Sequence, residues 1–458
     1  MSDRSQWNDD LLFAAAERAR RYQRELPGRS VAPSRAALAA LQAHRLSSLP
    51  LQGESPQAVL QELDEVGAGA TVASTGARYF GFVTGGALPA AVAANWLATA
   101  WDQNGFSTVS SPVATHFSEL SLRWVRALLG LPEEAAGVFV GGAALASFTA
   151  MAAARRSLFL KHGHDVDALG LCGAPPITVA CSADIHPTVL RGLGLLGLGR
   201  VPTVSLPTDD QGRIQVDRLP PLQGPALVCA QAGNVNTGAS DRFAVLRAYC
   251  DKYGAWLHVD GAFGLWAAAV PQLRPQVAGV ELADSWAVDA HKWLNVPYDS
   301  AIAFVRDGEL LRQCMGLQAS YLPTEGNNPI DYSPQSSTRA RGVDTWAALR
   351  SLGQDGVRAL IWRCCELAQR FARGIKAGGY DVLNDVVLNQ VLLNFGDQVS
   401  ICEAIAARVR DEGVCWVGTG RYRGRPVIRI SVSSWATTAE DVDRSVDALL
   451  RAAAVECV

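Results

Sequence analysis

Lysine is scarce in this chain of 458 residues. Its 41 basic side chains include only four lysines, Lys161, Lys252, Lys292 and Lys376. Three of them follow or end helical patterns, where surface positions are expected. Lys292 differs, because it lies between two short apolar segments and close to Trp286 and Trp293. This scarcity makes Lys292 the lysine whose environment calls for an explanation.

The chain also lacks the features of membrane, secreted and nucleic-acid-binding proteins. Its longest apolar runs, such as 88–94, are too short to span a bilayer, and we expect no signal peptide. A net charge of -3 provides no basic field for nucleic acid. Its ten cysteines have no metal-ligand spacing, which favours reduced thiols, a cytoplasmic location and no metal site.

Residues 1–70 are predicted to be a helical arm. The apolar spacing indicates helices at Trp7–Leu26, Ser34–His44 and Ser55–Val66, the last with Ser55 as N-cap and Pro56 in its first turn. A Gly/Ala/Ser/Thr linker is expected at 67–75. Such helices bury little on their own, so we expect them to pack on another domain or another subunit.

Residues 71–340 are predicted to form a large α/β domain with a mainly parallel sheet covered by helices. The candidate strands are Gly137–Val140, Ile177–Cys181, Ala226–Ala230, Trp256–Asp260, Trp286–Asp289 and Ala301–Val305. A polar connection at 306–340 follows, of the length typical of lids or disordered linkers. In such sheets, sites form beyond the carboxyl ends of the strands.

Residues 341–458 are predicted to form a small α+β domain. A long helix is expected at Val343–Ala377, then strands within Val386–Phe395, Val414–Val417 and Val427–Val432, and further helices at 398–410 and 439–454. We expect no internal repeat.

Two strand ends carry small or polar residues of functional interest. Gly141-Gly142-Ala143-Ala144 opens a helix directly after a strand, where backbone N–H groups favour a phosphate. A simple strand-to-helix turn is the alternative. His186 follows the next strand and is suited to stacking on a planar cofactor or shuttling a proton, with helix capping as the alternative.

Two further strand ends carry an acid and an amine. Asp260 ends a very apolar strand, and a buried carboxylate needs a cation or strong hydrogen bonds, so an arginine partner is the structural alternative. A metal pair with His258 lacks a third ligand with clear spacing. At Lys292, lost hydration is expected to lower the pKa and let the neutral amine form a Schiff base. The alternative is a lysine that extends from an apolar surface to solvent.

Together these strand ends form one pattern. A phosphate-binding turn, a stacking histidine, a carboxylate for a pyridine nitrogen and a Schiff-base lysine are the parts that pyridoxal phosphate requires.

The chain resembles the pyridoxal phosphate-dependent group II amino-acid decarboxylases, the family of aromatic L-amino-acid decarboxylase. The resemblance covers nearly the whole chain and is carried by six segments: Tyr79–Gly86, Gln231–Gly238, His258–Ala262, Asp289–Asp299, Trp346–Gly353 and Arg429–Ser434. It implies the fold type I architecture and a homodimer with shared active sites and exchanged N-terminal arms.

The resemblance also implies roles for individual residues. Lys292 takes the position of the cofactor-binding lysine, Asp260 that of the partner of the pyridine nitrogen, His186 that of the ring-stacking histidine and Ala262 that of the small residue beneath the ring. Phosphate contacts fall on Ala143, Ala144 and His291, and substrate contacts on Tyr79 and Phe80. For the segment of Tyr79 and Phe80, an edge segment with buried aromatics is the alternative to a pocket wall. Tyr332 takes the position of the catalytic-loop tyrosine, with an ordinary loop tyrosine as the alternative.

The expected function is decarboxylation of an L-amino acid, with an aromatic amino acid favoured by Tyr79, Phe80 and Phe82. Ala144 and Ser147 depart from the hydroxyl and amide side chains usual in relatives, which predicts weaker retention of the cofactor. The segment Gly418–Arg421 is less aromatic than usual and leaves the substrate class open. The alternatives are another reaction on the same cofactor, such as oxidative deamination to an aldehyde, and a non-catalytic partner subunit.

Overall fold

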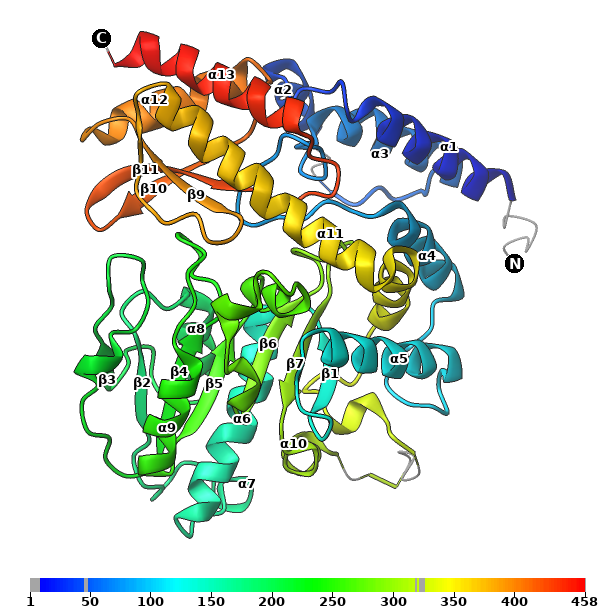
Figure 1. The fold of residues 1–458 in the computed structure, drawn as a ribbon. Coiled ribbons are helices and arrows are strands. Elements are labelled where there is room, and N and C mark those ends of the chain that lie inside the picture. Colours follow the sequence, from blue (N-terminus) through cyan, green and yellow to red (C-terminus); the bar gives the residue numbers. More distant parts are fainter. Residues whose placement is uncertain (1–8, 45–47, 318, 321–325, 458) are drawn as a thin grey trace.

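The computed structural model describes residues 9–44, 48–317, 319–320 and 326–457. They form a seven-stranded and a four-stranded sheet, with helices packed on both (Figure 1). None of the described helices is both long and apolar enough to cross a membrane.

The seven-stranded sheet confirms the predicted fold class. Its order is β1-β7-β6-β5-β4-β2-β3, and β7 runs antiparallel to both of its neighbours while the other pairs are parallel. The strands are β1 Ala136–Val140, β2 Thr178–Ser182, β3 Val204–Leu206, β4 Ala226–Gln231, β5 Trp256–Asp260, β6 Ser285–Asp289 and β7 Ala301–Val305. Every residue of β4 to β7 is buried, as their continuous apolar runs predicted. The short β3 was not predicted.

Helices cover this sheet as predicted, although those at 166–169 and 308–315 were not predicted. The helices are α4 Pro89–Trp101, α5 Pro112–Leu128, α6 Ala143–Lys161, α7 Val166–Leu169, α8 Pro187–Leu195, α9 Phe243–Tyr253 and α10 Gly308–Met315. α6 packs on β5, β6 and β7, and α9 packs on β4 and β5. The connection at 306–340 is more ordered than predicted, because Asp307 caps α10 by accepting from Leu310 N at 2.9 Å.

The N-terminal arm consists of α1 Asp9–Glu25, α2 Arg35–Ala43 and α3 Pro56–Ala70. Ser55 caps α3 by accepting from Ala58 N at 3.2 Å, as predicted. The helix runs on through Gly67 and Gly69, so the expected linker begins later than predicted. Trp7 lies outside the described residues. Neither α2 nor α3 contains a buried residue, and Figure 1 shows the arm at the edge of the molecule.

The second sheet is antiparallel, in the order β10-β11-β9-β8. Its strands are β8 Asp381–Val382, β9 Gln390–Asn394, β10 Gly418–Tyr422 and β11 Arg425–Ser431, and its helices are α11 Arg341–Ala377, α12 Val399–Asp411 and α13 Ala439–Glu456. α11 packs against α4, α5 and α13 and so joins the two sheets (Figure 1). Its helical geometry is interrupted at Gly353, where φ is 64°.

The predicted strand at 414–417 is wrong, because this segment pairs with a loop instead of the sheet. Phe80 N donates to Trp416 O at 2.9 Å, and Trp416 N donates to Arg78 O at 3.1 Å. The Trp416 ring lies where a Cβ at Gly81 would be, 2.0 Å from it. Only glycine fits there. The packing of Trp416 on Gly81 and its hydrogen bonds to Arg78 and Phe80 hold the glycine-rich segment 77–86 next to the chain that leads into β10.

Candidate active site

A cavity of about 350 Å³ opens beyond the carboxyl ends of β4, β5 and β6. Its walls come from six places in the sequence that the fold brings together. They are Phe82 and Val83; Gly141 to Ala144; His186 and Thr188; Gln231, Gly233 and Val235; Asp260, Ala262 and Phe263; and Asp289, His291, Lys292 and Tyr298. Seven of the ten predicted site residues are among them.

Lys292 lies three residues beyond the end of β6. Its Nζ is 2.9 Å from Asp289 Oδ2. Burial lowers the pKa of Lys292, but the charge and hydrogen bond of Asp289, together with Asp260, raise it by more. The net pKa is therefore above the usual lysine value, and the prediction that it is lowered is wrong for this state of the site. The prediction considered desolvation alone and omitted the carboxylate at the end of the strand.

Asp289 is the least exposed of the polar side chains around this cavity, at 1%. Its Oδ2 faces Lys292, and its Oδ1 has no hydrogen-bond partner among the described residues. His291 lies next to it, with Nε2 at 3.7 Å from Asp289 Oδ2. Ser300 N donates to His291 Nδ1 at 3.1 Å, which fixes the ring and directs Nε2 towards the carboxylate. Burial lowers the pKa of His291 in spite of this neighbour.

Asp260 ends β5 and is 7% exposed. Ala262 N donates to its Oδ1 at 3.2 Å, which turns the chain sharply and places the small Ala262 side chain at the cavity wall. The cation whose charge interacts with Asp260 is Lys292. His258 does not reach the cavity, because it bonds Ser285 Oγ at 2.9 Å inside the sheet. No group of metal-ligating side chains is found among the described residues.

His186 caps a helix, which was the structural alternative, and it also lies at the cavity wall. It is the N-cap of α8, and its Nδ1 accepts from Thr188 N at 3.3 Å and lies 2.7 Å from Thr188 Oγ1. Burial lowers the pKa of His186, and the charges of Lys292 and Arg429 lower it further. The neutral ring is therefore favoured.

The turn Gly141-Gly142 starts α6, and Gly142 provides no side-chain cap. The first N–H groups of a helix have no acceptor within it, so those of Ala143 and Ala144 are free to bind an anion. Ala144 has no hydroxyl to add. Ser147 does not line the cavity, and its buried Oγ has no hydrogen-bond partner among the described residues.

The predicted substrate residues separate in the structure. Tyr79 stacks on Trp416 with ring centroids 4.9 Å apart, and Phe80 lies in the core against Phe371. Neither lines the cavity, whereas the next residues, Phe82 and Val83, do. The segment approaches the reactive lysine so closely that a Cβ at Gly85 would lie 1.8 Å from Lys292 O. It is therefore a pocket wall with buried aromatics behind it.

Tyr332 lies outside the cavity of its own chain. It lines a separate small pocket with Gly105, Ser118 and Arg341 and packs against the buried cluster of Val138. Burial raises the pKa of its phenol. From this position Tyr332 does not reach the cavity of its own chain and cannot donate a proton there.

Several residues at or next to the cavity were not identified from the sequence, among them Asp289, Tyr298 and Arg429. Tyr298 lines it and lies over His291, with ring centroids 4.4 Å apart. Arg429, on β11, donates from Nη2 to Val235 O at 2.9 Å, and its buried Nε has no hydrogen-bond partner among the described residues. A single arginine within the apolar run 427–432 was the available signal for Arg429. Tyr298 had no signal beyond its distance from Lys292 in the sequence.

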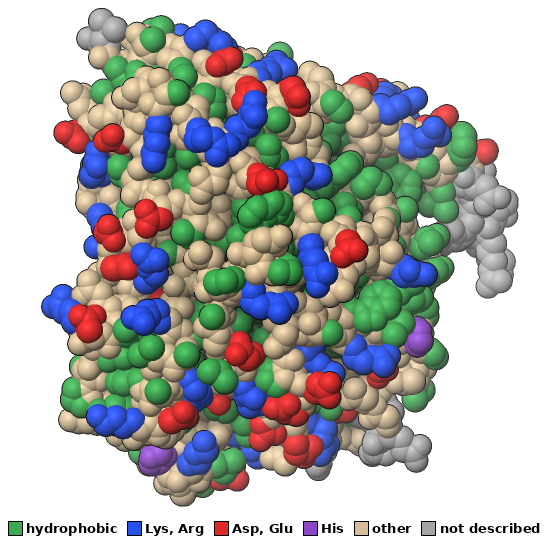
Figure 2. Space-filling model, viewed as in Figure 1, with side chains coloured by type: hydrophobic (Ala, Val, Ile, Leu, Met, Phe, Trp, Pro, Cys, Tyr) green, Lys and Arg blue, Asp and Glu red, His purple; other side chains and the backbone are tan. Residues whose placement is uncertain are grey.

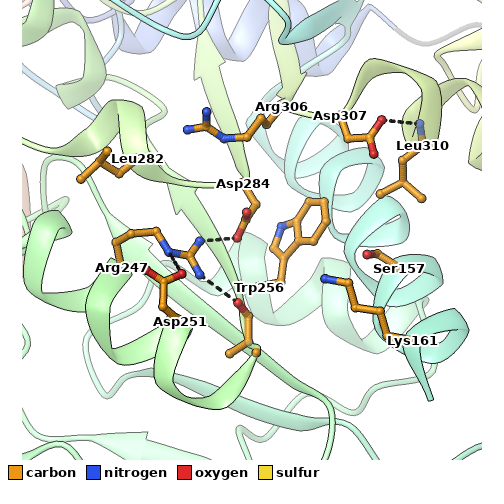
Figure 3. Close-up of a pocket in the computed structure, with 12 residues that line it drawn as sticks. Ser157, Lys161, Arg247, Asp251, Trp256, Leu282, Asp284, Arg306, Asp307 and Leu310 are labelled. Atoms are coloured by element: carbon orange, nitrogen blue, oxygen red, sulfur yellow. Dashed lines mark hydrogen bonds and ion pairs between the residues drawn. The ribbon is translucent and has the colours of Figure 1, made fainter.

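A larger hollow, of about 520 Å³, lies at the opposite end of the sheet (Figure 3). Apart from Lys161, its charged groups pair with one another and with the backbone. Arg247 Nη1 donates to Asp284 Oδ2 at 2.7 Å and Arg247 Nη2 to Ala255 O at 3.2 Å. Arg247 Nε lies 2.9 Å from Asp251 Oδ1, close enough for charge attraction although not aligned for a hydrogen bond. This pairing indicates a structural region.

The residues of the smaller cavity fit pyridoxal phosphate. An amine, a free helix N-terminus and a buried carboxylate line one space, and Asp289 Oδ1 and Gln231 Nε2 are buried there without partners. Buried polar atoms left unpaired by the protein are typical of a place that a polar group enters. Lys292 would bind the aldehyde, the start of α6 and His291 the phosphate, and Asp260 the ring nitrogen.

Known proteins agree with pyridoxal phosphate as the cofactor. The family described as the pyridoxal-dependent decarboxylase conserved domain matches residues 42–394. Aromatic-L-amino-acid decarboxylase of Bacillus atrophaeus is 25% identical over 86% of this chain and 85% of its own. The 3,4-dihydroxyphenylacetaldehyde synthase of Aedes aegypti is 24% identical over 74% of this chain and 69% of its own.

The fold is shared with a solved structure of Oryza sativa TDC with PLP and tryptamine. The TM-score is 0.89 at 22% identity, over 98% of this chain and 99% of that one. The match of the family over most of the chain shows that this protein belongs to the pyridoxal-dependent decarboxylases and is a pyridoxal phosphate-dependent carboxy-lyase.

Proposed function

We propose that this enzyme decarboxylates an aromatic L-amino acid to the amine and carbon dioxide. The observation that carries the substrate class is the set of aromatic rings at the cavity mouth. Phe82 and Tyr298 line the cavity, and Phe82 lies 5.0 Å from the ring of Trp416. Phe82 is 71% exposed in the single chain, so its ring is free to meet a substrate. Offset and edge contacts between such rings contribute about 0.5–1.5 kcal/mol beyond burial.

The residues of the cavity divide the work of the reaction. Bound pyridoxal phosphate supplies an electron sink for the electron pair that remains when a carboxylate leaves as carbon dioxide. Lys292 would hold the cofactor in the absence of substrate. Asp260 would keep the proton on the ring nitrogen, which would strengthen the sink, and His186 would stack on the ring and fix its plane.

The substrate carboxylate has a candidate partner in Arg429. Arg429 is half-buried, its buried Nε has no hydrogen-bond partner among the described residues, and it donates to Val235, which lines the cavity. Its charge lowers the pKa of His186, so the guanidinium lies close to the cavity. A carboxylate there would satisfy a cation that the chain leaves incompletely bonded. The carboxyl group would then lie beside His186, on the Arg429 side of the cavity.

The electron pair left by carbon dioxide must finally receive a proton at the substrate α-carbon. Tyr332 remains our proposed donor, and because it lies away from the cavity of its own chain, a partner subunit would have to present it. A phenol stays protonated at neutral pH. The segment around Tyr332 would also exclude water from the cavity.

We propose that the partner is a second copy of this chain. The homodimer is supported by exposed apolar surface around the arm. Trp96, Leu97 and Trp101 of α4 are 44%, 54% and 43% exposed. A groove of about 760 Å³ with Tyr22, Trp96 and other apolar residues runs between α1 and α4, and Figure 2 shows hydrophobic side chains gathered beneath the arm. Sedimentation that found an active monomer would contradict the dimer.

The division into residues 1–70, 71–340 and 341–458 remains part of this proposal, with the arm exchanged between the subunits. A cytoplasmic location is supported by the ten cysteines, all of which are free thiols.

The substrate class is tested by a panel of L-amino acids assayed together for carbon dioxide and amine. We expect aromatic amino acids to give the two products in equal amounts and acidic or small amino acids to give neither. A preference for acidic amino acids would contradict the proposal. The matched variant is Phe82→Leu, which removes the ring and keeps the cavity apolar. We expect it to raise KM for aromatic substrates more than it lowers kcat.

Decarboxylation with oxidative deamination to an aldehyde is the second candidate. It is favoured by the placement of Tyr332 outside the cavity, since a poorly delivered proton leaves the carbanion open to oxygen. Comparing amine and aldehyde yields of the wild type and Tyr332→Phe under air separates the two. We expect amine from the wild type and an increased aldehyde share from the variant. Aldehyde from the wild type would establish the second candidate, and unchanged amine from Tyr332→Phe would remove Tyr332 from the mechanism.

A further inference from the structure

Asp289 does more at this site than end a strand. It is 1% exposed, its Oδ2 lies 2.9 Å from Lys292 Nζ, and its Oδ1 has no partner among the described residues. A carboxylate buried in this way is stabilised mainly by the single cation that it contacts. In turn, the Asp289 carboxylate favours the charged form of the Lys292 amine.

The other groups facing Lys292 do not cancel this effect. Asp260, from β5, adds a second carboxylate whose charge also favours the ammonium. His186, at the start of α8, and His291, on the same loop, both have lowered pKa values and are neutral near pH 7. Tyr298 has a raised pKa and is a neutral phenol. Lys292 is thus surrounded by two carboxylates and three uncharged rings.

We propose that Asp289 is a positioning residue that holds Lys292 as an ammonium ion until the cofactor arrives, so that cofactor loading is controlled by release of a proton. The inference rests on the proposed role of Lys292. An ammonium ion has no lone pair and cannot attack an aldehyde. Nζ must first give one proton to solvent. Its lone pair then forms the bond to the aldehyde carbon, and the aldehyde oxygen leaves as water with the two remaining Nζ protons.

The placement of Asp289 gives the cofactor-free protein a defined resting state. The ion pair keeps Lys292 Nζ at the end of β6, inside the cavity. The neutral isostere, asparagine, keeps the shape of the side chain and removes the charge, and is therefore the informative substitution.

The first test measures the reactivity of Lys292 in cofactor-free protein. Labelling with dinitrofluorobenzene as a function of pH, followed by peptide mapping, gives the pKa of this one lysine. We expect wild-type Lys292 to label at higher pH than a free lysine derivative, and Asp289→Asn to increase labelling at neutral pH about tenfold or more, since one pKa unit is a factor of ten. The control is Asp284→Asn, which makes the same change in an ion pair at the other end of the sheet and should leave Lys292 unchanged.

Equal labelling profiles in the wild type and Asp289→Asn would overturn the inference. If Asp289→Asn does not fold, the wild-type profile decides alone, because labelling of Lys292 at a lower pH than the free lysine derivative contradicts the proposal. A second measurement follows cofactor loading by visible absorbance after mixing with pyridoxal phosphate. We expect the wild-type loading rate to rise with pH and the Asp289→Asn rate to be higher and less dependent on pH. Failure of both proteins to load at any pH would refute the proposed function, while the labelling result would still decide the role of Asp289.

Discussion

The two ends of the seven-stranded sheet offer two hollows of opposite character. At the amino ends of β5 and β6, the larger one contains the Arg247–Asp284 pair, bonded at 2.7 Å (Figure 3). At the carboxyl ends, the smaller one contains Lys292 with Asp289, whose second oxygen is unpaired. β5 connects them, since Trp256 lines the first and Asp260 the second.

The comparison shows that the volume of a hollow does not identify a binding site, whereas buried polar atoms without a partner do. In the larger hollow Asp284 accepts from both Arg247 and Leu257 N, and Arg306 donates to the carbonyls of Ala283 and Glu281. The one buried side-chain atom of that lining without a hydrogen bond to a described residue, Arg247 Nε, lies 2.9 Å from Asp251 Oδ1, so its charge is compensated within the protein. In the smaller cavity the chain leaves polar atoms buried and unpaired, at a free energy that a structural role alone does not explain.

The largest expected effect separates two lysines, one at each hollow. Lys292→Ala should reduce turnover to less than about one thousandth, the scale seen when a covalent nucleophile is removed. Lys161→Ala, at the rim of the larger hollow, should keep full activity. Borohydride reduction and peptide mapping should place the pyridoxyl label on Lys292. A label on Lys161, or an active Lys292→Ala, would reverse the assignment of the two hollows.

The next effect concerns Asp260. We expect Asp260→Ala to retain the fold and the assembly of the wild type but to lose about a hundredfold or more of turnover, the scale of losing one preorganised electrostatic contact. The reason is that the ring nitrogen of the cofactor would no longer be held protonated. The measurement is kcat with a full complement of bound cofactor. Turnover close to that of the wild type would give Asp260 a structural role only, like that of Asp284.

The sheet could be predicted from the sequence because its strands are buried on both faces. Continuous apolar runs located β5 and β7 to the residue. Prediction failed where long-range pairing replaced local preference. The segment 414–417 is apolar enough for a strand, yet Trp416 pairs with the loop before Phe80. β10, which includes Gly418 and Gly420, has little strand propensity of its own and forms because it pairs with β11.

The candidate site could be predicted to the extent that its residues end strands. Lys292, Asp260, His186 and the start of α6 meet in one cavity because parallel strands bring their carboxyl ends together. The neighbours of each residue could not be predicted. The raised pKa of Lys292 depends on the distance to Asp289. Phe82 lines the cavity instead of the predicted Phe80 because of the way in which one loop packs on Trp416.

A smaller effect tests the strand that joins the two hollows. His258, midway along β5, is completely buried, and burial lowers its pKa to about 3. In the unfolded chain His258 has a pKa of about 6.5, so below this pH it is protonated in the unfolded chain but neutral in the folded one. The free energy of unfolding therefore falls as the pH falls from 6.5 towards 3. At pH 5 the loss from this group should be about 2 kcal/mol. Thermal unfolding midpoints at pH 7 and pH 5 should therefore differ less in His258→Gln than in the wild type. His162→Gln, at an exposed histidine, is the control and should behave as the wild type does.

The smallest expected effect returns to the larger hollow and should appear in stability alone. Asp284→Ala removes the acceptor of Arg247 Nη1 and of Leu257 N, both at 2.7 Å. Arg247 is only 17% exposed and would lose its best partner. Hydrogen bonds to charged groups contribute about 1.5–3 kcal/mol, and water entering this open hollow would recover part of that, so we expect a loss of about 1–2 kcal/mol.

Asp251→Ala is the matched control, because Asp251 also contacts Arg247 but is 66% exposed, and exposed pairs contribute about 0–1 kcal/mol. Urea unfolding midpoints should therefore fall clearly for Asp284→Ala and little for Asp251→Ala, with kcat unchanged in both. A fall in kcat without a fall in stability would give the larger hollow a functional role, and the distinction between paired and unpaired groups would then no longer separate the two ends of the sheet.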